Sequence, residues 1–206
     1  MNLGIYSFAH SSLNDEIAFY QKRVFDKFSI PIKQLVSSDS HPTALEKIIQ
    51  DAKEDCLLLF DVDCIPLHPS FLDRIIKEVE PLNTLAGAIQ CANHKDPKRS
   101  YVGPCFCGFS KTLYAACGRP SLSEWERGDV MQKFTDECRY LQRYEQVKVQ
   151  YWMVTNGGDN CWDLPDDGGK FGHGTIYEGL IYHQFEIRRP EQHLPFIDKC
   201  KEVLNG

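Results

Sequence analysis

The chain has 206 residues, of which 42% are hydrophobic and 25% charged, a composition typical of a single globular domain. Its net charge is −6 and its basic residues are scattered, which argues against nucleic acid as the main partner. An acidic chain can still bind a nucleotide when a divalent cation neutralises the phosphates.

The first half of the sequence alternates between strand and helix patterns. Asn14 is a good helix N-cap, because apolar residues recur at helical spacing directly after it. Strands are expected at 3–9, 32–36, 56–60 and 84–91, and helices at 14–28, 42–53 and 69–79. This order predicts an α/β fold with a mostly parallel central sheet and helices on both faces.

The second half is richer in glycine, proline and aromatic residues. Strands are expected at 103–109, 147–154 and 176–183, helices at 110–117, 122–145 and 190–204, and a long polar loop at 155–175. A loop of that length inside a compact domain is usually functional when it is ordered. No linker interrupts the pattern, so we expect one domain over residues 1–206.

The cysteines and the N-terminus bear on the cellular compartment. Nine cysteines are present, an odd number, and the first residues lack the basic and apolar regions of a signal peptide. No apolar run reaches the length of about 18 residues that a membrane-spanning helix needs. We therefore expect reduced, mostly buried thiols, no integral membrane segment and a cytoplasmic location.

A D-x-D motif, Asp61-Val62-Asp63, comes directly after the apolar run 56–60. Ligands of open α/β sheets bind beyond the carboxyl ends of the strands, where this motif is expected. Two carboxylates two residues apart in a turn can share one Mg²⁺ or Mn²⁺, which in turn bridges diphosphate oxygens. The alternative is that both aspartates only cap or shape the turn.

In this motif and its position the chain resembles nucleotide-sugar glycosyltransferases of the GT-A fold, whose D-x-D follows a central strand. The resemblance covers most of the chain in element order, but only the D-x-D region is specific. It implies a nucleotide-binding half at 1–100 and an acceptor-side half at 101–206. It also implies that Asp63 ligates the metal directly, while Asp61 assists or contacts the ribose.

The same resemblance assigns further donor contacts. The end of the first strand, Phe8, Ala9 and His10, would hold the nucleoside, and Asp39 after the second strand would read uracil, which implies a UDP-sugar. A late histidine often completes the metal site of the family, and His183 matches it. Because imidazole suits Mn²⁺ better than Mg²⁺, the set Asp61, Asp63 and His183 favours Mn²⁺. A histidine satisfied near the sheet edge is the alternative.

Transfer to a hydroxyl acceptor, on a glycan or another molecule, also needs a carboxylate that handles the acceptor proton if the anomeric configuration is inverted. Thr135 resembles a helix N-cap, and Asp136 and Glu137 directly after it are the first candidates. Asp129 is the competing candidate. Carboxylates at a helix start are also favoured by the helix dipole without any catalytic role.

Two other functions compete with glycosyl transfer. A phosphotransferase of the haloacid-dehalogenase type also carries an apolar strand followed by D-x-D, but its motif continues with Gly-Thr near the N-terminus, whereas Cys64-Ile65 stand here after some 60 residues. The other alternative is a non-catalytic domain that binds a nucleotide sugar without turnover.

Overall fold

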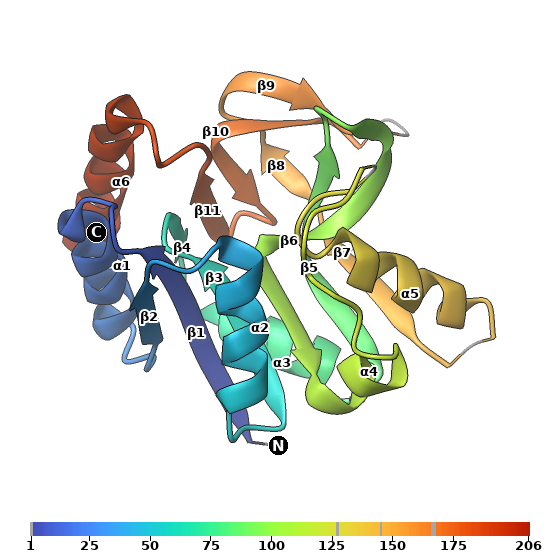
Figure 1. Cartoon of the computed structure of the whole chain (residues 1–206). Coiled ribbons are helices and arrows are strands. Elements are labelled where there is room, and N and C mark those ends of the chain that lie inside the picture. The colour runs from blue at the N-terminus through green and yellow to red at the C-terminus, as the bar shows by residue number, and fades with distance from the viewer. Residues whose placement is uncertain (1, 127, 145, 166–167) are drawn as a thin grey trace.

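The computed structural model describes residues 2–126, 128–144, 146–165 and 168–206. A six-stranded sheet with the order β2-β1-β3-β6-β5-β7 forms the centre (Figure 1). Its strands are β1 (Leu3–His10), β2 (Lys33–Ser37), β3 (Cys56–Asp61), β5 (Thr84–Ala92), β6 (Asp96–Ser110) and β7 (Lys148–Trp152). β6 runs antiparallel to both its neighbours and all other pairs in this sheet are parallel, so the predicted mixed, mostly parallel central sheet is confirmed.

Six α-helices flank this sheet within the described residues. They are α1 (Asp15–Lys27), α2 (His41–Asp51), α3 (Ser70–Val79), α4 (Lys111–Ala116), α5 (Gln132–Gln142) and α6 (His193–Asn205), and a short 3₁₀ helix η1 (Pro190–Gln192) precedes the last. The expected cap of α1 is confirmed, because the Asn14 side chain accepts a hydrogen bond from the backbone N–H of Glu16. None of these helices is long and apolar enough to cross a membrane.

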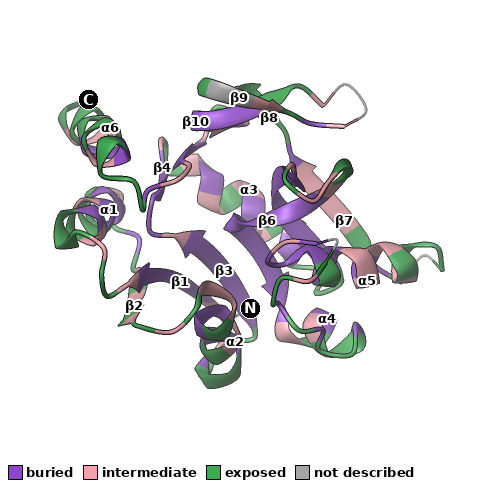
Figure 2. Cartoon of the chain, turned by 45° about the horizontal axis from the view of Figure 1, so that its top comes forward, coloured by how far each residue is buried: buried purple, intermediate pink, exposed green. Residues whose placement is uncertain are grey.

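The central strand β3 is buried on both faces, as its continuous apolar sequence predicts (Figure 2). Its side chains alternate between two cores: Leu57 and Leu59 pack with α2, α4 and α5, whereas Leu58 and Phe60 pack with α3 on the opposite face. The helices therefore fix the position of β3, and with it the position of the residues that follow it.

A second, antiparallel sheet packs beside the end of β3. Its order is β4-β11-β10-β8, with β9 paired to β10, and its strands are β4 (Cys64–Pro66), β8 (Val154–Asn156), β9 (Asp159–Asp163), β10 (Lys170–Tyr177) and β11 (Ile181–Gln184). The prediction of one loop over 155–175 is therefore wrong, because β9 and the first half of β10 form a hairpin there. Residues 166 and 167 of that loop lie outside the described part of the chain.

Candidate functional site

The D-x-D motif forms the tight connection between β3 and β4. β3 ends at Asp61 and β4 begins at Cys64, so the two sheets meet at these residues. The buried side chain of Gln21, on α1, holds this turn: its Nε2 donates to the carbonyl oxygens of Asp61 (2.7 Å) and Cys64 (2.9 Å). Gln21 is held in turn by Ser7, which donates to its Oε1 at 2.8 Å.

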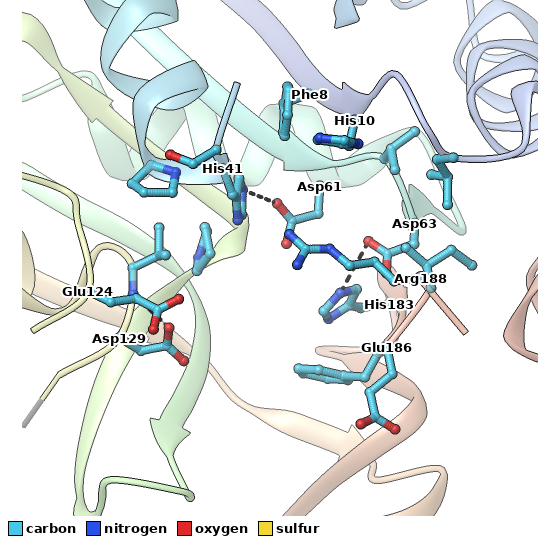
Figure 3. A pocket seen from close by; sticks show the side chains of 18 of the residues that line it. Phe8, His10, His41, Asp61, Asp63, Glu124, Asp129, His183, Glu186 and Arg188 are labelled. Carbon is cyan, nitrogen blue, oxygen red and sulfur yellow. Dashed lines mark hydrogen bonds and ion pairs between the residues drawn. The ribbon is translucent and has the colours of Figure 1, made fainter. Parts of the chain in front are cut away.

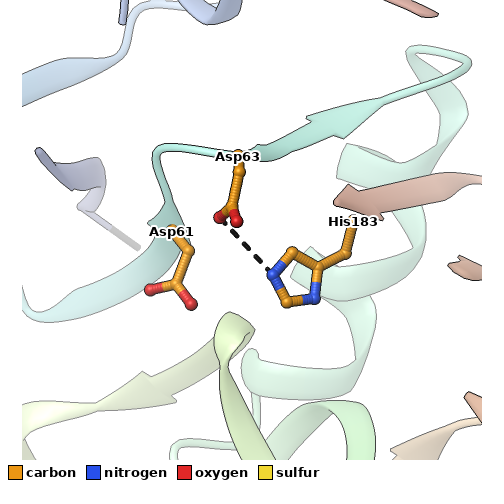
Figure 4. Close-up of side chains that lie close together, drawn as sticks. All are labelled: Asp61, Asp63 and His183. Atoms are coloured by element: carbon orange, nitrogen blue, oxygen red, sulfur yellow. Dashed lines mark ion pairs between the residues drawn. The ribbon is translucent and has the colours of Figure 1, made fainter. Parts of the chain in front are cut away.

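His183 reaches the motif through the second sheet. In β11 it pairs with Cys64 of β4, and its Nε2 lies 3.4 Å from Oδ1 of Asp63 (Figure 4). One ligand atom each from Asp61, Asp63 and His183 lie within 4.8 Å of one another. The predicted metal residues thus converge, although they come from opposite halves of the sequence.

These three residues fit a divalent cation by their chemistry and spacing. Ligand atoms of one Mg²⁺ ion lie up to about 4.2 Å apart, and the three ligand atoms here lie within 4.8 Å of one another, so a small adjustment of the side chains would bring all three onto one ion. Carboxylate oxygens and one imidazole nitrogen form a donor set that divalent metals of this size accept. His183 and Asp63 are 4% and 5% exposed, so side-chain packing already fixes two of the three ligands.

Burial and neighbouring charges shift the pKa values of Asp63 and His183. Burial raises the pKa of Asp63, and the nearby carboxylate of Asp61 raises it further, against the opposing effect of His183. Burial lowers the pKa of His183, but Cys105 and Asp63 outweigh it, so this pKa lies well above its ordinary value. The two carboxylates of Asp61 and Asp63 therefore bring negative charge close to His183 in a buried place, and the raised pKa of His183 reflects in part the charge of Asp63.

His41 is a site residue that the sequence interpretation missed. It is the first residue of α2, after the N-cap Ser40, and its Nε2 lies 2.9 Å from Oδ1 of Asp61. Its ring stacks on Phe8 with a centroid distance of 5.7 Å and an interplanar angle of 14°. Burial lowers the pKa of His41, but the charge of Asp61 outweighs it and the pKa is raised.

A cleft of about 1030 Å³ opens in front of the motif (Figure 3). One side, which we call the strand wall, consists of Asp61, Asp63 and His183. The other side, the loop wall, consists of Glu124, Asp129 and Val130, which lie between α4 and α5 in the sequence. Arg188 also lines the cleft and lies beside Asp61 and Asp63, where its charge helps to lower the pKa of Asp61.

Of the four residues predicted to hold the nucleoside, two line the cleft and two do not. Phe8 and His10 line the cleft, whereas Ala9 points to the opposite side of β1 and is buried between α1 and α6. Asp39 does not line the cleft: it accepts a hydrogen bond from Ser37 Oγ at 2.8 Å. The two serines beside it line the cleft instead, namely Ser38 and Ser40.

Asp129 is held by one contact within the loop wall and by one from β6. The backbones of Trp125 and Gly128 hydrogen-bond to each other in a tight turn, and a Cβ on Gly128 would lie 2.5 Å from the Trp125 ring. Trp125 therefore packs on its own turn. One carboxylate oxygen of Asp129 accepts from the backbone N–H of Val130 at 2.8 Å and the other from the hydroxyl of Tyr101 at 3.3 Å.

Asp136 and Glu137 lie on α5 and do not line the cleft. The expected helix start at Thr135 is wrong, because α5 begins at Gln132 and Thr135 Oγ1 instead accepts from the backbone N–H of Val102 at 3.1 Å. Asp136 forms an ion pair with Arg99 at 2.7 Å. Of the three predicted acid–base candidates, Asp129 alone faces the cleft.

No protein-family model and no curated protein matches the chain. Solved structures similar to it include A197 from STIV, with 13% identity over 66% of this chain and 78% of that one and a TM-score of 0.46. A second is the mannosyltransferase PcManGT from Pyrobaculum calidifontis in complex with GDP-Man and Mn²⁺, with 8% identity, 72% and 54% coverage, and a TM-score of 0.49. A third is CMP:2-keto-3-deoxy-manno-octonic acid synthetase complexed with CTP, with 11% identity, 73% and 89% coverage, and a TM-score of 0.46.

Proposed function

We propose that this protein is a metal-dependent glycosyltransferase that moves a sugar from a nucleotide-sugar donor to a hydroxyl acceptor. The observation that carries the proposal is the convergence of Asp61, Asp63 and His183 within 4.8 Å, in a cleft at the carboxyl ends of parallel strands. A diphosphate leaving group needs charge neutralisation at such a place, and these ligands suit the ion that supplies it.

Asp63 and His183 would hold the ion directly, with Asp61 as the third ligand. When bound, the metal acts as a Lewis acid that neutralises the departing diphosphate. We propose Mn²⁺, because the imidazole in the ligand set favours it over Mg²⁺. The guanidinium of Arg188, on the same side of the cleft, is placed to bind a diphosphate oxygen.

The nucleoside is proposed to bind between the ends of β1 and β2 and the start of α2. Phe8, His10, Ser38 and Ser40 line the cleft there and offer an aromatic ring and hydroxyl groups for a base and a ribose. His41 contributes by contacting Asp61, so that this carboxylate keeps its direction. We propose a UDP-linked donor, a choice that a panel of nucleotide sugars tests directly.

Asp129 is the proposed acceptor-side carboxylate. It faces the strand wall across the cleft, and the two hydrogen bonds that it accepts keep its oxygens oriented (Figure 3). As a general base it would take the proton of the acceptor hydroxyl while the oxygen of that hydroxyl attacks the sugar. Asp136 is already paired with Arg99 outside the cleft, so we propose no such role for it.

The proposal is tested by thermal shift with UDP-, GDP-, CDP- and dTDP-sugars, each with and without Mn²⁺. A ligand at a hundredfold excess over its Kd stabilises the fold by about 2.7 kcal/mol, which gives a clear shift. We expect a shift that needs both donor and metal and that disappears in Asp63→Asn but persists in the control Asp136→Asn. A donor-induced rise in Tm that is the same with and without Mn²⁺, or that is still present in Asp63→Asn, would contradict the proposal.

Turnover separates the competing functions. A glycosyltransferase without an acceptor slowly hydrolyses its donor. Release of free nucleoside diphosphate in the presence of Mn²⁺, from the nucleotide sugar that raises the Tm, would therefore identify a transferase. Release of inorganic phosphate from a phosphate ester would instead identify a phosphotransferase. Binding of a nucleotide sugar without turnover over a panel of sugar acceptors would identify a binding domain.

A further inference from the structure

Two buried thiols face each other outside the cleft. Cys117, at the C-terminal end of α4, and Cys138, within α5, place their sulfur atoms 3.5 Å apart. Both lie in the apolar core between these helices and the central sheet. Neither lines the cleft, so their chemistry is separate from the proposed donor reaction.

We propose that Cys117 and Cys138 are a redox-active pair that forms a disulfide upon reaction with a peroxide. Their sulfur atoms are already in van der Waals contact, so bond formation needs a closing movement of about 1.5 Å to reach the S–S length. Small side-chain rotations supply movements of this size without separating the helices.

The two cysteines differ in exposure, as is expected when one of them reacts first with the oxidant and the other then completes the disulfide. Cys117 is 8% exposed, whereas Cys138 is fully buried, so a small oxidant reaches Cys117 first. The thiol of Cys138 hydrogen-bonds to Cys117 and lowers its pKa, against the opposing effect of burial. A lower pKa provides more of the thiolate, which is the reactive form.

The reaction balances with hydrogen peroxide as the oxidant. The Cys117 thiolate attacks one peroxide oxygen; the S–O bond forms, the O–O bond breaks, and hydroxide leaves and takes up a proton. The sulfur of Cys138 then attacks the sulfenic acid at Cys117; the S–S bond forms, the S–O bond breaks, and water leaves with the proton of Cys138. In sum, two thiols and one peroxide give one disulfide and two waters.

The position of the pair gives this reaction a structural consequence. The segment between the two cysteines, residues 118–137, contains the whole loop wall with Glu124 and Asp129. A disulfide would tie the start of this segment to α5. The oxidised protein should therefore hold the loop wall more rigidly, whereas the strand wall, formed by β3, β4 and β11, is untouched.

Intact-mass measurement of the full chain, reduced and then treated with hydrogen peroxide, tests the pair. We expect a loss of two hydrogen atoms, a disulfide between Cys117 and Cys138 in the peptide map, and a rise in Tm of about 5 °C or more that a reductant reverses. Cys138→Ala and Cys138→Ser should both lose the disulfide and leave a sulfenic acid at Cys117, which dimedone traps.

Cys200→Ser is the matched control, because Cys200 is a buried thiol on α6, in a different core. This variant should form the disulfide like the unmodified protein. The proposal is overturned if peroxide gives no intramolecular disulfide, or if the peptide map joins other cysteines, such as Cys64 and Cys105. It is equally overturned if both Cys138 variants still lose two hydrogen atoms.

Discussion

The two walls of the cleft are built by different means. The strand wall takes its residues from β3, β11 and the turn before β4, whose positions are fixed by strand register and by two apolar cores. The loop wall takes its residues from the connection between α4 and α5, within whose described residues (118–126 and 128–131) Gly118, Arg119 and Met131 adopt left-handed backbone conformations. A regular scaffold therefore carries the proposed metal site, and a strained loop carries the proposed acceptor carboxylate.

The largest expected effect is the loss of the metal ligand Asp63. Asp63→Asn removes a charge from the strand wall and should lower metal-dependent donor turnover about a thousandfold, because the ion supplies several kcal/mol of charge stabilisation. Turnover is measured as nucleoside diphosphate release over a Mn²⁺ titration. Asp198→Asn, on the exposed side of α6, is the control and should behave like the unmodified protein.

The loop wall is tested by comparing Asp129 with Asp136. Asp129→Asn should reduce sugar transfer about 100-fold or more, because a general base contributes at least that factor. The affinity for Mn²⁺ should stay unchanged in this variant, since the metal ligands belong to the strand wall. Asp136→Asn should change transfer by less than about threefold; a larger loss there than in Asp129→Asn would restore the helix residue as the acid–base candidate.

Substitution of Gln21 tests how far the strand wall depends on the hydrogen bonds that hold the turn between β3 and β4. Gln21→Leu leaves the carbonyl oxygens of Asp61 and Cys64 without their donor, which should lower the free energy of unfolding by about 2–4 kcal/mol. It should also weaken Mn²⁺ binding about tenfold or more, since outer-shell contacts orient the ligands. Urea unfolding and calorimetry measure the two effects, and unaltered Mn²⁺ affinity in a folded variant would argue against this support.

The smallest effect is expected at the opposite end of the sheet, far from both walls. Glu54 accepts hydrogen bonds from Lys33 and Tyr6, which lower its pKa to about 2. Because the folded pKa lies below the unfolded value of about 4.3, the stabilisation is complete above that value and lost as the pH falls towards 2. Glu54→Gln should therefore cost less than about 1 kcal/mol at neutral pH and nothing near pH 2, with cleft chemistry unchanged.

The strand wall could be predicted from sequence because its signals are local. The apolar run 56–60 predicted a doubly buried strand, and the two aspartates after it predicted the position of the cleft. His183 was found through the resemblance and the strand pattern around it. His41 was missed because its contact with Asp61 depends on how α2 sits beside the sheet, which no local pattern contains.

The second half of the chain was predicted less well because long-range contacts shape it. Thr135 has the sequence of a helix cap, but its hydroxyl accepts from the backbone of β6, thirty-three residues away. The helix begins at Gln132, which is before Thr135 but ten residues after the start of the helix expected over 122–145, and Asp136 pairs with Arg99. Likewise, the glycines and aspartates of 155–175 suggested a loop, yet β9 gains its hydrogen bonds from β10.

The alternation of β3 between two cores has a consequence for how this protein can evolve. Deleting one residue within 56–60 would shift the register on one side of the deletion, so that either the leucines before it would turn into the opposite core or the residues after it, including both aspartates, would turn to the wrong side. The alternation of side chains along β3 thus determines both the packing of the two cores and the direction of the aspartates in the cleft. Insertions and deletions should accumulate elsewhere in homologous chains, and this strand should change only by substitution.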